Sequence, residues 1–280
     1  MAAAPMHYRK FSPHPDLAPW VECVYEWQGI AEAAQDIQTS PSAFAALVIN
    51  EGADYSVYQH RTPPAVVPDA FVCGLFTSNY HLVLNGPIQM MGVVFKPWGF
   101  HNFFGTRMSS LVNSRLDLDL FLPGEGAMLA QAVRMEAEPE AKARVLQDFL
   151  LGRLAEAKAR VNVIDDAAQL MELKNGGITI AEVAEHFHIS KRYVEKQFLA
   201  KVGVSPKFYA RIKRFSFLMV ELIYRKNQDW QALVEKTGLH DQSHLIKEFL
   251  EFNQANPEHY LNSHNEMARF VEKISWGKTN

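Results

Sequence analysis

The sequence is short of cysteine, of long apolar runs and of net charge, and each shortage excludes a class of protein. Its 280 residues include only two cysteines, Cys23 and Cys73, too few for a disulfide framework or a four-cysteine zinc site. Both lie within apolar runs, so we expect free, buried thiols. No run of about 18 apolar residues occurs, so no membrane span is expected. The start of the chain lacks the apolar segment of a secretory signal, which favours a cytoplasmic protein.

Motifs of catalysis and cofactor binding are also missing. The chain has no GxSxG, GxGxxG or P-loop sequence. Three histidines of the N-terminal half, His60, His81 and His101, are scattered and form no His-x-His pair. We therefore predict no catalytic residues, no metal ion and no cofactor.

The net charge of −3 does not by itself indicate a polyanionic partner. Residues 1–159 carry 11 Lys and Arg against 16 Asp and Glu, whereas residues 160–262 carry 14 against 13. The C-terminal part is thus only mildly basic, and an argument for DNA binding has to come from local pattern.

Short β-like runs separated by turn signals fill the N-terminal part of the chain. The turn signals include Asn85-Gly86-Pro87 and Lys96-Pro97-Trp98-Gly99. The pattern predicts a β-rich domain over 1–122, a small barrel or sandwich. Its expected strands are 21–27, 43–50, 71–76, 81–84 and 88–95.

Residues 123–164 have the Ala-, Glu-, Arg- and Leu-rich composition of surface helices. Pro139 divides them into a helical hairpin, because proline inside a helix removes a hydrogen bond and clashes with the preceding turn. The hairpin either packs on its own domain or serves as a linker and dimer contact. The sequence leaves both interpretations open.

Residues 178–262 contain an internal repeat with an offset of 51 residues. The matching pairs are Val194 and Leu245, Lys196 and Lys247, Phe198 and Phe249, Leu199 and Leu250, Pro206 and Pro257, and Tyr209 and Tyr260.

The first copy has the local pattern of a helix-turn-helix. Thr179 and Glu182 form a capping box for its first helix, and Ser190 is a good N-cap for its second. The second helix buries Val194 and Phe198, one turn apart. Its opposite face then presents Arg192, Glu195 and Lys196, with Lys191 beside the N-terminus.

The second copy repeats the pattern. Gly238 ends its first helix and Asp241 caps the next, which buries Leu245 and Phe249. The outward residues of that helix are Gln242, Ser243, Ile246 and Lys247.

One long helix, 206–225, is predicted between the copies, with Ser205 as its cap and Pro206 in its first turn. A helix of about 20 residues spans about 30 Å. That length approaches the roughly 34 Å between successive major-groove faces of B-DNA, so one chain could place both second helices in the groove.

Residues 165–262 resemble the AraC/XylS family of bacterial transcription regulators. The resemblance rests on ITIAEVAEHFHISKRYVEKQF, VGVSPKFYARIKRF, TGLHDQSHLIKEF and NPEHY. It implies an all-helical double helix-turn-helix domain that binds promoter DNA. The family's base-contacting positions fall on Arg192, Glu195, Lys196, Gln242, Ser243, Ile246 and Lys247. Lys191, Lys201 and Lys207 are the candidates for phosphate contacts.

The second unit departs from the family pattern. Asp241, Glu248 and Glu251 make its second helix poorly basic, and NQANP lacks the usual glycine. We therefore expect sequence selection to rest mostly on the first unit.

The N-terminal domain resembles a cupin-like sensor domain through PHPDLAPWVECVYEWQG and GVVFKPWGFHNFFG. This resemblance implies effector binding or dimerisation. The aromatic residues of a barrel could hold a small-molecule effector or could simply fill the core. They are Trp27, Phe44, Tyr55, Phe71, Phe95 and Trp98.

The predicted fold is thus α+β and multidomain, with a β-rich cupin-like barrel and helical hairpin before an all-α double helix-turn-helix domain and a tail over 263–280. A DNA-binding regulator of this kind has promoter DNA and a small effector as partners, with a homodimer and RNA polymerase as further candidates. Two other interpretations stay open. One is a small-molecule binding or metal-dependent cupin-type protein whose helical part binds a partner, and the other is an interaction protein that has lost DNA binding.

Overall fold

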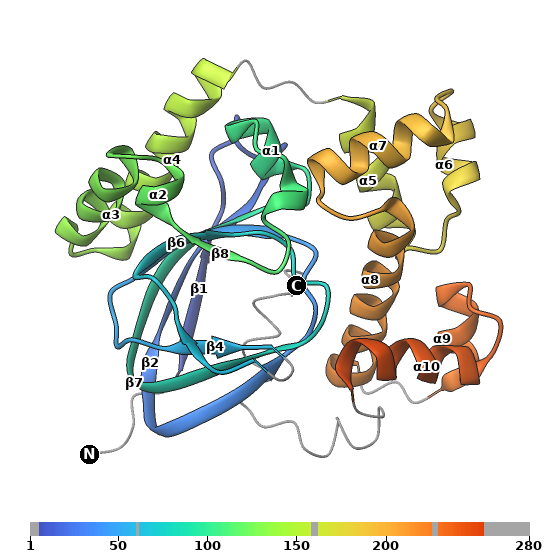
Figure 1. Cartoon of the computed structure of the whole chain (residues 1–280), viewed down its shortest axis with the longest axis horizontal. Coiled ribbons are helices and arrows are strands. Elements are labelled where there is room, and N and C mark those ends of the chain that lie inside the picture. The colour runs from blue at the N-terminus through green and yellow to red at the C-terminus, as the bar shows by residue number, and fades with distance from the viewer. Residues whose placement is uncertain (1–5, 60–61, 158–161, 226–228, 255–280) are drawn as a thin grey trace.

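The structure is a computed structural model that describes residues 6–59, 62–157, 162–225 and 229–254. Figure 1 shows a curled β-sheet capped by helices, with a second, all-helical region beside it. The predicted α+β, two-part architecture is confirmed. The repeat positions Pro257 and Tyr260, the NPEHY segment, the tail 263–280 and His60 lie outside the described residues.

The N-terminal domain is built on one antiparallel sheet. The sheet order is β1-β2-β7-β3-β6-β8, with β4 paired to β7 and β5 paired to β4. Because β7 pairs with β3 along one half and with β4 along the other, the sheet curls around an interior. The strands are β1 His7–Phe11, β2 Val21–Thr39, β3 Ala45–Asn50, β4 Ser56–Tyr58, β5 Ala65–Val66, β6 Ala70–Cys73, β7 Tyr80–Phe95 and β8 Arg115–Asp117.

The longest strand pair, β2 with β7, corrects one sequence prediction. Asn85-Gly86-Pro87 reads as a turn between two strands, but β7 runs through it without a break. Gly86 has a φ of 91°, and the register against β2 shifts between Ala31 and Gln35 at this point. The glycine therefore serves a bulge inside a long ribbon instead of a chain reversal.

Alternate residues along the strands belong to two different apolar clusters, one inside the curled sheet and one between the sheet and the helices. Every residue of β3 is buried, but Ala46 and Val48 face the inside of the curl while Leu47 and Ile49 face the helices. This period of two is the geometry of a pleated strand. The apolar residues that face the helices belong to one cluster, which continues through the helical layer into the C-terminal domain.

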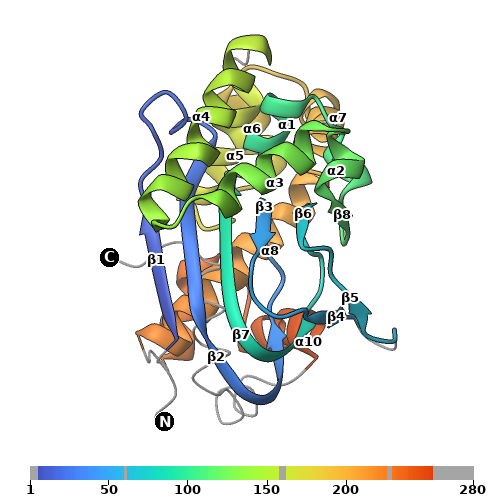
Figure 2. The same ribbon diagram turned by 90° about the vertical axis from the view of Figure 1, so that its left-hand side faces the viewer.

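The helices of the N-terminal domain cover one end of the sheet (Figure 2). Pro139 is the first residue of α4, so the predicted division of the hairpin is confirmed. The hairpin packs on its own sheet, where the Lys142 ammonium donates to both carboxylate oxygens of Glu51 at 2.6 and 2.7 Å. The helical elements here are α1 Gly99–Phe104, η1 Met108–Ser110, α2 Leu118–Phe121, α3 Glu125–Met135 and α4 Pro139–Ala157.

The C-terminal domain contains two helix-turn-helix units on one central helix. The predicted helix 206–225 forms as α8, and its last residues make a π-helical turn, η2. In Figure 1, α8 runs between α7 and α10. The elements are α5 Val163–Leu173, α6 Ile180–His186, α7 Lys191–Lys201, α8 Pro206–Met219, η2 Val220–Tyr224, α9 Trp230–Thr237 and α10 Gln242–Asn253.

Gly203, in the turn between α7 and α8, lies tightly against the N-terminal domain. Its φ is 99°, and a Cβ built there would lie 2.9 Å from the backbone oxygen of Met108 and 2.9 Å from Cγ2 of Val112. A side chain at this position would push the first helix-turn-helix unit away from η1.

We therefore predict that Gly203→Ala lowers the thermal unfolding midpoint more than Gly105→Ala does. Gly105 also has a positive φ, 62°, but no atom lies within 4 Å of a Cβ placed there, so it measures the backbone cost alone. Overpacking adds about 1–3 kcal/mol at Gly203. Equal midpoints for the two variants, measured by calorimetry, would contradict the close approach.

Candidate nucleic-acid interface and ligand pocket

The first candidate reading helix, α7, is positioned by hydrogen bonds that the sequence predicts. The capping box is present: Thr179 N donates to Glu182 Oε2 at 2.8 Å, and Glu182 N donates to Thr179 Oγ1 at 3.2 Å. Ser190 caps α7 by accepting from Tyr193 N at 3.1 Å. His188, with a φ of 53°, makes the turn between the two helices.

The burial of α7 matches the expected division into two faces. Val194 and Phe198 are fully buried against the rest of the domain. Arg192, Glu195 and Lys196 are exposed, as is Lys191. The helix therefore presents two guanidinium or ammonium donors and one carboxylate acceptor to solvent on one side. The base contacts assigned to these residues stay a prediction.

The second candidate reading helix, α10, has the same construction. Gly238 ends α9 in the left-handed conformation, with a φ of 65°. Asp241 caps α10 by accepting from His244 N at 2.8 Å. Leu245 and Phe249 are fully buried. The predicted outward set is accessible, with Ile246 half-buried and three residues exposed, Gln242, Ser243 and Lys247.

The structure corrects the expected effect of the acidic residues of α10. Glu248 lies on the buried face, where Oε1 accepts from Arg211 Nε at 2.9 Å and from Arg214 Nη2 at 3.2 Å. Glu251 also pairs with Arg211. Both carboxylates are thus paired with arginines of α8, but only Glu248 is removed from the exposed face, since Glu251 is exposed.

Lys201 was predicted to contact phosphate, and the structure contradicts this. Its side chain is only 5% exposed and its ammonium is paired with Asp165 Oδ1. Asp165 Oδ2 also accepts from Asn102 Nδ2 of α1 at 3.1 Å. Sequence position at the end of α7 suggested exposure, but the packing of α7 on α1 buries this end. Lys207, the other phosphate candidate besides Lys191, is exposed.

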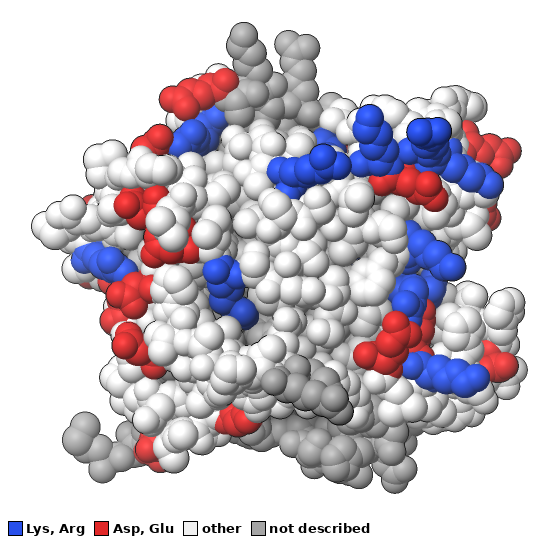
Figure 3. All heavy atoms as spheres, viewed as in Figure 1, with Lys and Arg blue, Asp and Glu red and all other residues white. Residues whose placement is uncertain are grey.

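Basic side chains gather on the face of the C-terminal domain that Figure 1 views. Figure 3 shows Lys and Arg over α7 and in the region between α7 and α10. Asp and Glu side chains lie among them on the same face, so the basic side chains over α7 supply most clearly the positive charge expected of a DNA-binding surface.

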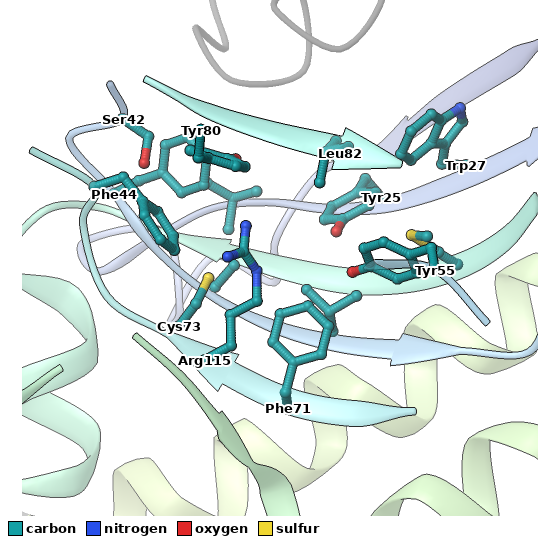
Figure 4. A pocket seen from close by; sticks show the side chains of 15 residues that line it. Tyr25, Trp27, Ser42, Phe44, Tyr55, Phe71, Cys73, Tyr80, Leu82 and Arg115 are labelled. Carbon is teal, nitrogen blue, oxygen red and sulfur yellow. The ribbon is translucent and has the colours of Figure 1, made fainter. Parts of the chain in front are cut away.

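The inside of the curled sheet contains a cavity of about 90 Å³. Four of the six aromatic residues predicted to hold an effector line it, Trp27, Phe44, Tyr55 and Phe71. Figure 4 shows their rings around a common space, with the Arg115 guanidinium near its centre. A cavity with a mostly apolar wall and one cation is suited to a small, partly apolar ligand.

Phe95 and Trp98 do not line the cavity, which corrects the prediction for both. Phe95 follows Val94 on β7, so it points to the opposite face of the sheet, where it packs edge-on against Phe100 with ring centroids 5.2 Å apart. Trp98 is in the turn before α1 and donates its indole N–H to Pro19 O at 3.2 Å. The alternation around Val94 could have excluded Phe95.

The charged residue of the cavity is not among the site residues predicted from the sequence. Arg115 is on β8, a three-residue strand that carries no hydrophobic pattern. Its guanidinium lies over the Phe76 ring at 4.4 Å and the Tyr80 ring at 4.7 Å. Only the pairing of β8 with β6 brings it to the pocket, so no local signal could have found it.

The end of α10 is held by the N-terminal domain. The backbone oxygen of Asn253 accepts from Gln38 Nε2 at 2.9 Å and from Asn79 Nδ2 at 3.3 Å, and its side-chain oxygen accepts from Ser40 Oγ at 3.2 Å. The last carbonyls of a helix have no partner within it, so an outside donor satisfies them. We call Gln38, Ser40 and Asn79 the α10 socket.

Two of the three histidines considered for a metal site, His81 and His101, lie among the described residues and have other partners. His81 Nδ1 lies 2.7 Å from Asp36 Oδ1, and the ring stacks on Tyr58. His101 Nδ1 lies 2.8 Å from Thr106 O. Within the described ranges, no three His, Cys, Asp or Glu side chains are grouped as metal ligands. In the same ranges, no helix is both long and apolar enough to cross a membrane.

Comparison with known families decides the class of the C-terminal domain. Residues 183–263 match the model of a helix-turn-helix domain, which starts inside α6 and includes α7 to α10. The C-terminal domain is an AraC-type helix-turn-helix domain. The chain accordingly belongs among DNA-binding transcription regulators, as the resemblance implied. Residues 9–117, the sheet before this AraC-type domain, match a domain of unknown function, DUF6597.

Several solved structures are similar to the chain in fold at low sequence identity. ToxT from Vibrio cholerae is 8% identical with a TM-score of 0.46, over 91% of this chain and 98% of that chain. A ToxT structure with a bound unsaturated fatty acid is 9% identical with a TM-score of 0.44, over 85% and 93%. The AraC-like transcriptional activator CuxR is 14% identical with a TM-score of 0.35, over 77% and 82%. No curated protein matches the chain in sequence.

The two lysines at the α7–α8 junction of the AraC-type domain are predicted to respond differently to the same substitution. Lys201→Met leaves Asp165 buried without its cation, which costs about 3–5 kcal/mol, so it should lower the unfolding midpoint sharply. Lys207→Met removes an exposed cation that is predicted to contact phosphate. It should keep the midpoint and reduce the slope of log affinity against log salt by about 0.9. Thermal melts and a salt series of DNA-binding isotherms measure both, and a reduced salt slope in a well-folded Lys201→Met would restore Lys201 as a phosphate contact.

Proposed function

We propose that the protein is a sequence-specific, effector-controlled regulator that reads promoter DNA with α7 and α10. The supporting observation is that both helices expose their polar faces while their apolar faces are fixed to the same helix, α8. Reading of two groove segments by one chain then requires no further rearrangement within the domain.

The side chains on α7 supply the more discriminating chemistry. Arg192 and Lys196 are suited to donate to a guanine edge, and Glu195 is suited to accept from cytosine N4. Lys191 and Lys207 would contact phosphates and set the register of the domain on the duplex. None of these five side chains has an ion-pair partner among the residues described, so all are available to DNA.

The side chains on α10 offer base contacts that are weaker than those proposed for α7. Gln242 suits an adenine edge, and Ile246 suits a thymine methyl group. Ser243 contacts either, and Lys247 adds positive charge. Glu248 is turned inward and paired with Arg211 and Arg214, so it does not oppose DNA from the exposed face of this helix.

The length of the spacer agrees with binding on one side of the duplex. Residues 206–224 are helical throughout. At about 1.5 Å per residue this gives a rod of nearly 30 Å, close to one turn of B-DNA.

Effector control is proposed to act through the α10 socket. The pocket is lined by Ser42 and Tyr80, and the socket residues Ser40 and Asn79 lie two and one positions away in the chain. A ligand that moves these segments also moves the donors that hold Asn253. The pocket and the second reading helix are therefore coupled through a few covalent bonds. A cytoplasmic location, a homodimer and a contact with RNA polymerase belong to the same proposal.

Substitution of the α7 face tests the DNA-reading proposal. On a site selected from a random DNA pool, Arg192→Ala and Lys196→Ala should each weaken binding about tenfold or more, because a base contact is worth roughly 1–3 kcal/mol. Lys174→Ala is the control, since Lys174 is an exposed lysine of the same domain outside both reading helices. Fluorescence anisotropy gives the affinities. A similar small loss in all three variants would mean that α7 senses only the charge of DNA.

Substitution within the socket tests the coupling. Gln38→Ala removes one hydrogen bond to the end of α10, worth about 1 kcal/mol, so amide exchange across residues 242–253 should rise several-fold and DNA affinity should fall. Gln28→Ala is the matched control, because Gln28 is an exposed glutamine of the same strand with no contact to α10. Unchanged exchange in α10 of the Gln38→Ala protein would refute the coupling.

A further inference from the structure

The pocket contains one charged side chain that its surroundings leave without a counterion. Arg115 is the only charged residue among those that line the cavity. The part of the chain that the structure describes offers it no carboxylate partner. Asp117, two residues away on β8, is engaged elsewhere, since its Oδ1 accepts from Asp119 N at 2.8 Å and Leu120 N at 3.0 Å.

The titratable groups around Arg115 do not neutralise it. Burial raises the pKa of the Tyr25, Tyr55 and Tyr80 phenols and of the Cys73 thiol. All four are therefore uncharged near neutral pH. They are hydrogen-bonding groups of a neutral wall, so the cation of Arg115 is the one full charge that this wall presents.

The Arg115 guanidinium carries five N–H donors, and one hydrogen-bond partner of its side chain is the Tyr80 hydroxyl. Its guanidinium carbon lies 4.4 Å from the ring centroid of Phe76 and 4.7 Å from that of Tyr80. The donors of a guanidinium form a fixed fork, so one bond to Tyr80 leaves further N–H groups for a ligand. A planar carboxylate accepts two such parallel hydrogen bonds.

We infer that the pocket binds a small organic monocarboxylate, with its carboxylate on the Arg115 guanidinium and its apolar body among the aromatic rings. The cavity of about 90 Å³ exceeds the space for one water several-fold, so a multi-atom ligand fits. A single cation favours a single negative charge, because a second buried charge would have no partner. A ligand without an acceptor for the guanidinium would leave buried donors unsatisfied, and a neutral acceptor would form a weaker bond than a carboxylate does.

This inference names the class of effector and therefore rests on the proposal that the pocket holds one. The aromatic residues by themselves are compatible with either ligand binding or core packing. A core filled by Trp27, Tyr55 and Phe71 alone needs no cation, whereas the pocket brings Arg115 in among them.

Binding of acids to the full-length protein without DNA tests the inference. The probes are straight-chain acids of about four to twelve carbons and one- and two-ring aromatic acids, each compared with its primary amide. We expect at least one acid to bind ten times more tightly than its amide, which corresponds to about 1.4 kcal/mol. Calorimetric titration supplies the dissociation constants, and the chain and ring arms show which apolar body is preferred.

Two variants assign any preference to Arg115. Arg115→Gln should bring the acid down to the affinity of its amide, whereas Arg107→Gln, an exposed arginine of the same domain, should keep the preference. The inference is overturned if no acid binds, if every acid binds like its amide, or if Arg115→Gln keeps the preference. The comparison on the unaltered protein stands even if Arg115→Gln fails to fold.

The same measurement separates this inference from effector control. An acid that binds through Arg115 but leaves DNA affinity unchanged would support the ligand class and count against control of DNA binding. If only neutral ligands changed DNA affinity, effector control would be supported and the carboxylate class of ligand would be contradicted.

Discussion

The ion pairs between Glu248 and two arginines of α8 are the interaction on which the arrangement of the DNA-binding domain depends. Arg211 and Arg214 lie one turn apart on the central helix and both donate to Glu248 of the second reading helix. Arg214 also donates to Gly176 O, at 2.9 Å, in the turn after α5. One arginine thus connects both halves of the domain, and separating such a buried pair costs several kcal/mol.

The N-terminal domain adds one anchor to each half. Asn102 of α1 bonds Asp165, whose carboxylate holds Lys201 at the end of α7, and the socket holds Asn253 at the end of α10. Both reading helices therefore meet the N-terminal domain at their C-terminal ends. Their N-terminal halves, which carry the exposed polar residues, remain free on the opposite side. The N-terminal domain can therefore change the positions of α7 and α10 without covering the exposed polar face of either helix.

A ligand in the pocket would act on the chain segments that hold α10. Its wall and the socket belong to the same two chain segments, which flank the start of β7 and the end of β2. An anion on Arg115 would neutralise the charge that now stacks on Phe76 and Tyr80, within a few residues of Asn79. Ligand chemistry and helix position are thus connected through a short, densely bonded part of the sheet.

Local features of this structure were predictable from the sequence, and features set by distant packing were not. The capping residues Thr179, Ser190 and Asp241 and the buried stripes of α7 and α10 follow from neighbours within one or two turns, and all are confirmed. Lys201 and Glu248 differ because their surroundings come from α1 and α8, more than thirty residues away. Sheet pairing likewise decides that Arg115 faces into the pocket.

Footprinting of one protein copy on its selected DNA site tests the central claim most directly. Hydroxyl-radical cleavage, on complexes whose mass shows a single bound chain, reports which sugars are shielded. A rigid rod of nearly 30 Å between the reading helices predicts two protected patches on one face of the duplex, about 10 base pairs apart. A single patch, or two patches on opposite faces, would contradict the account.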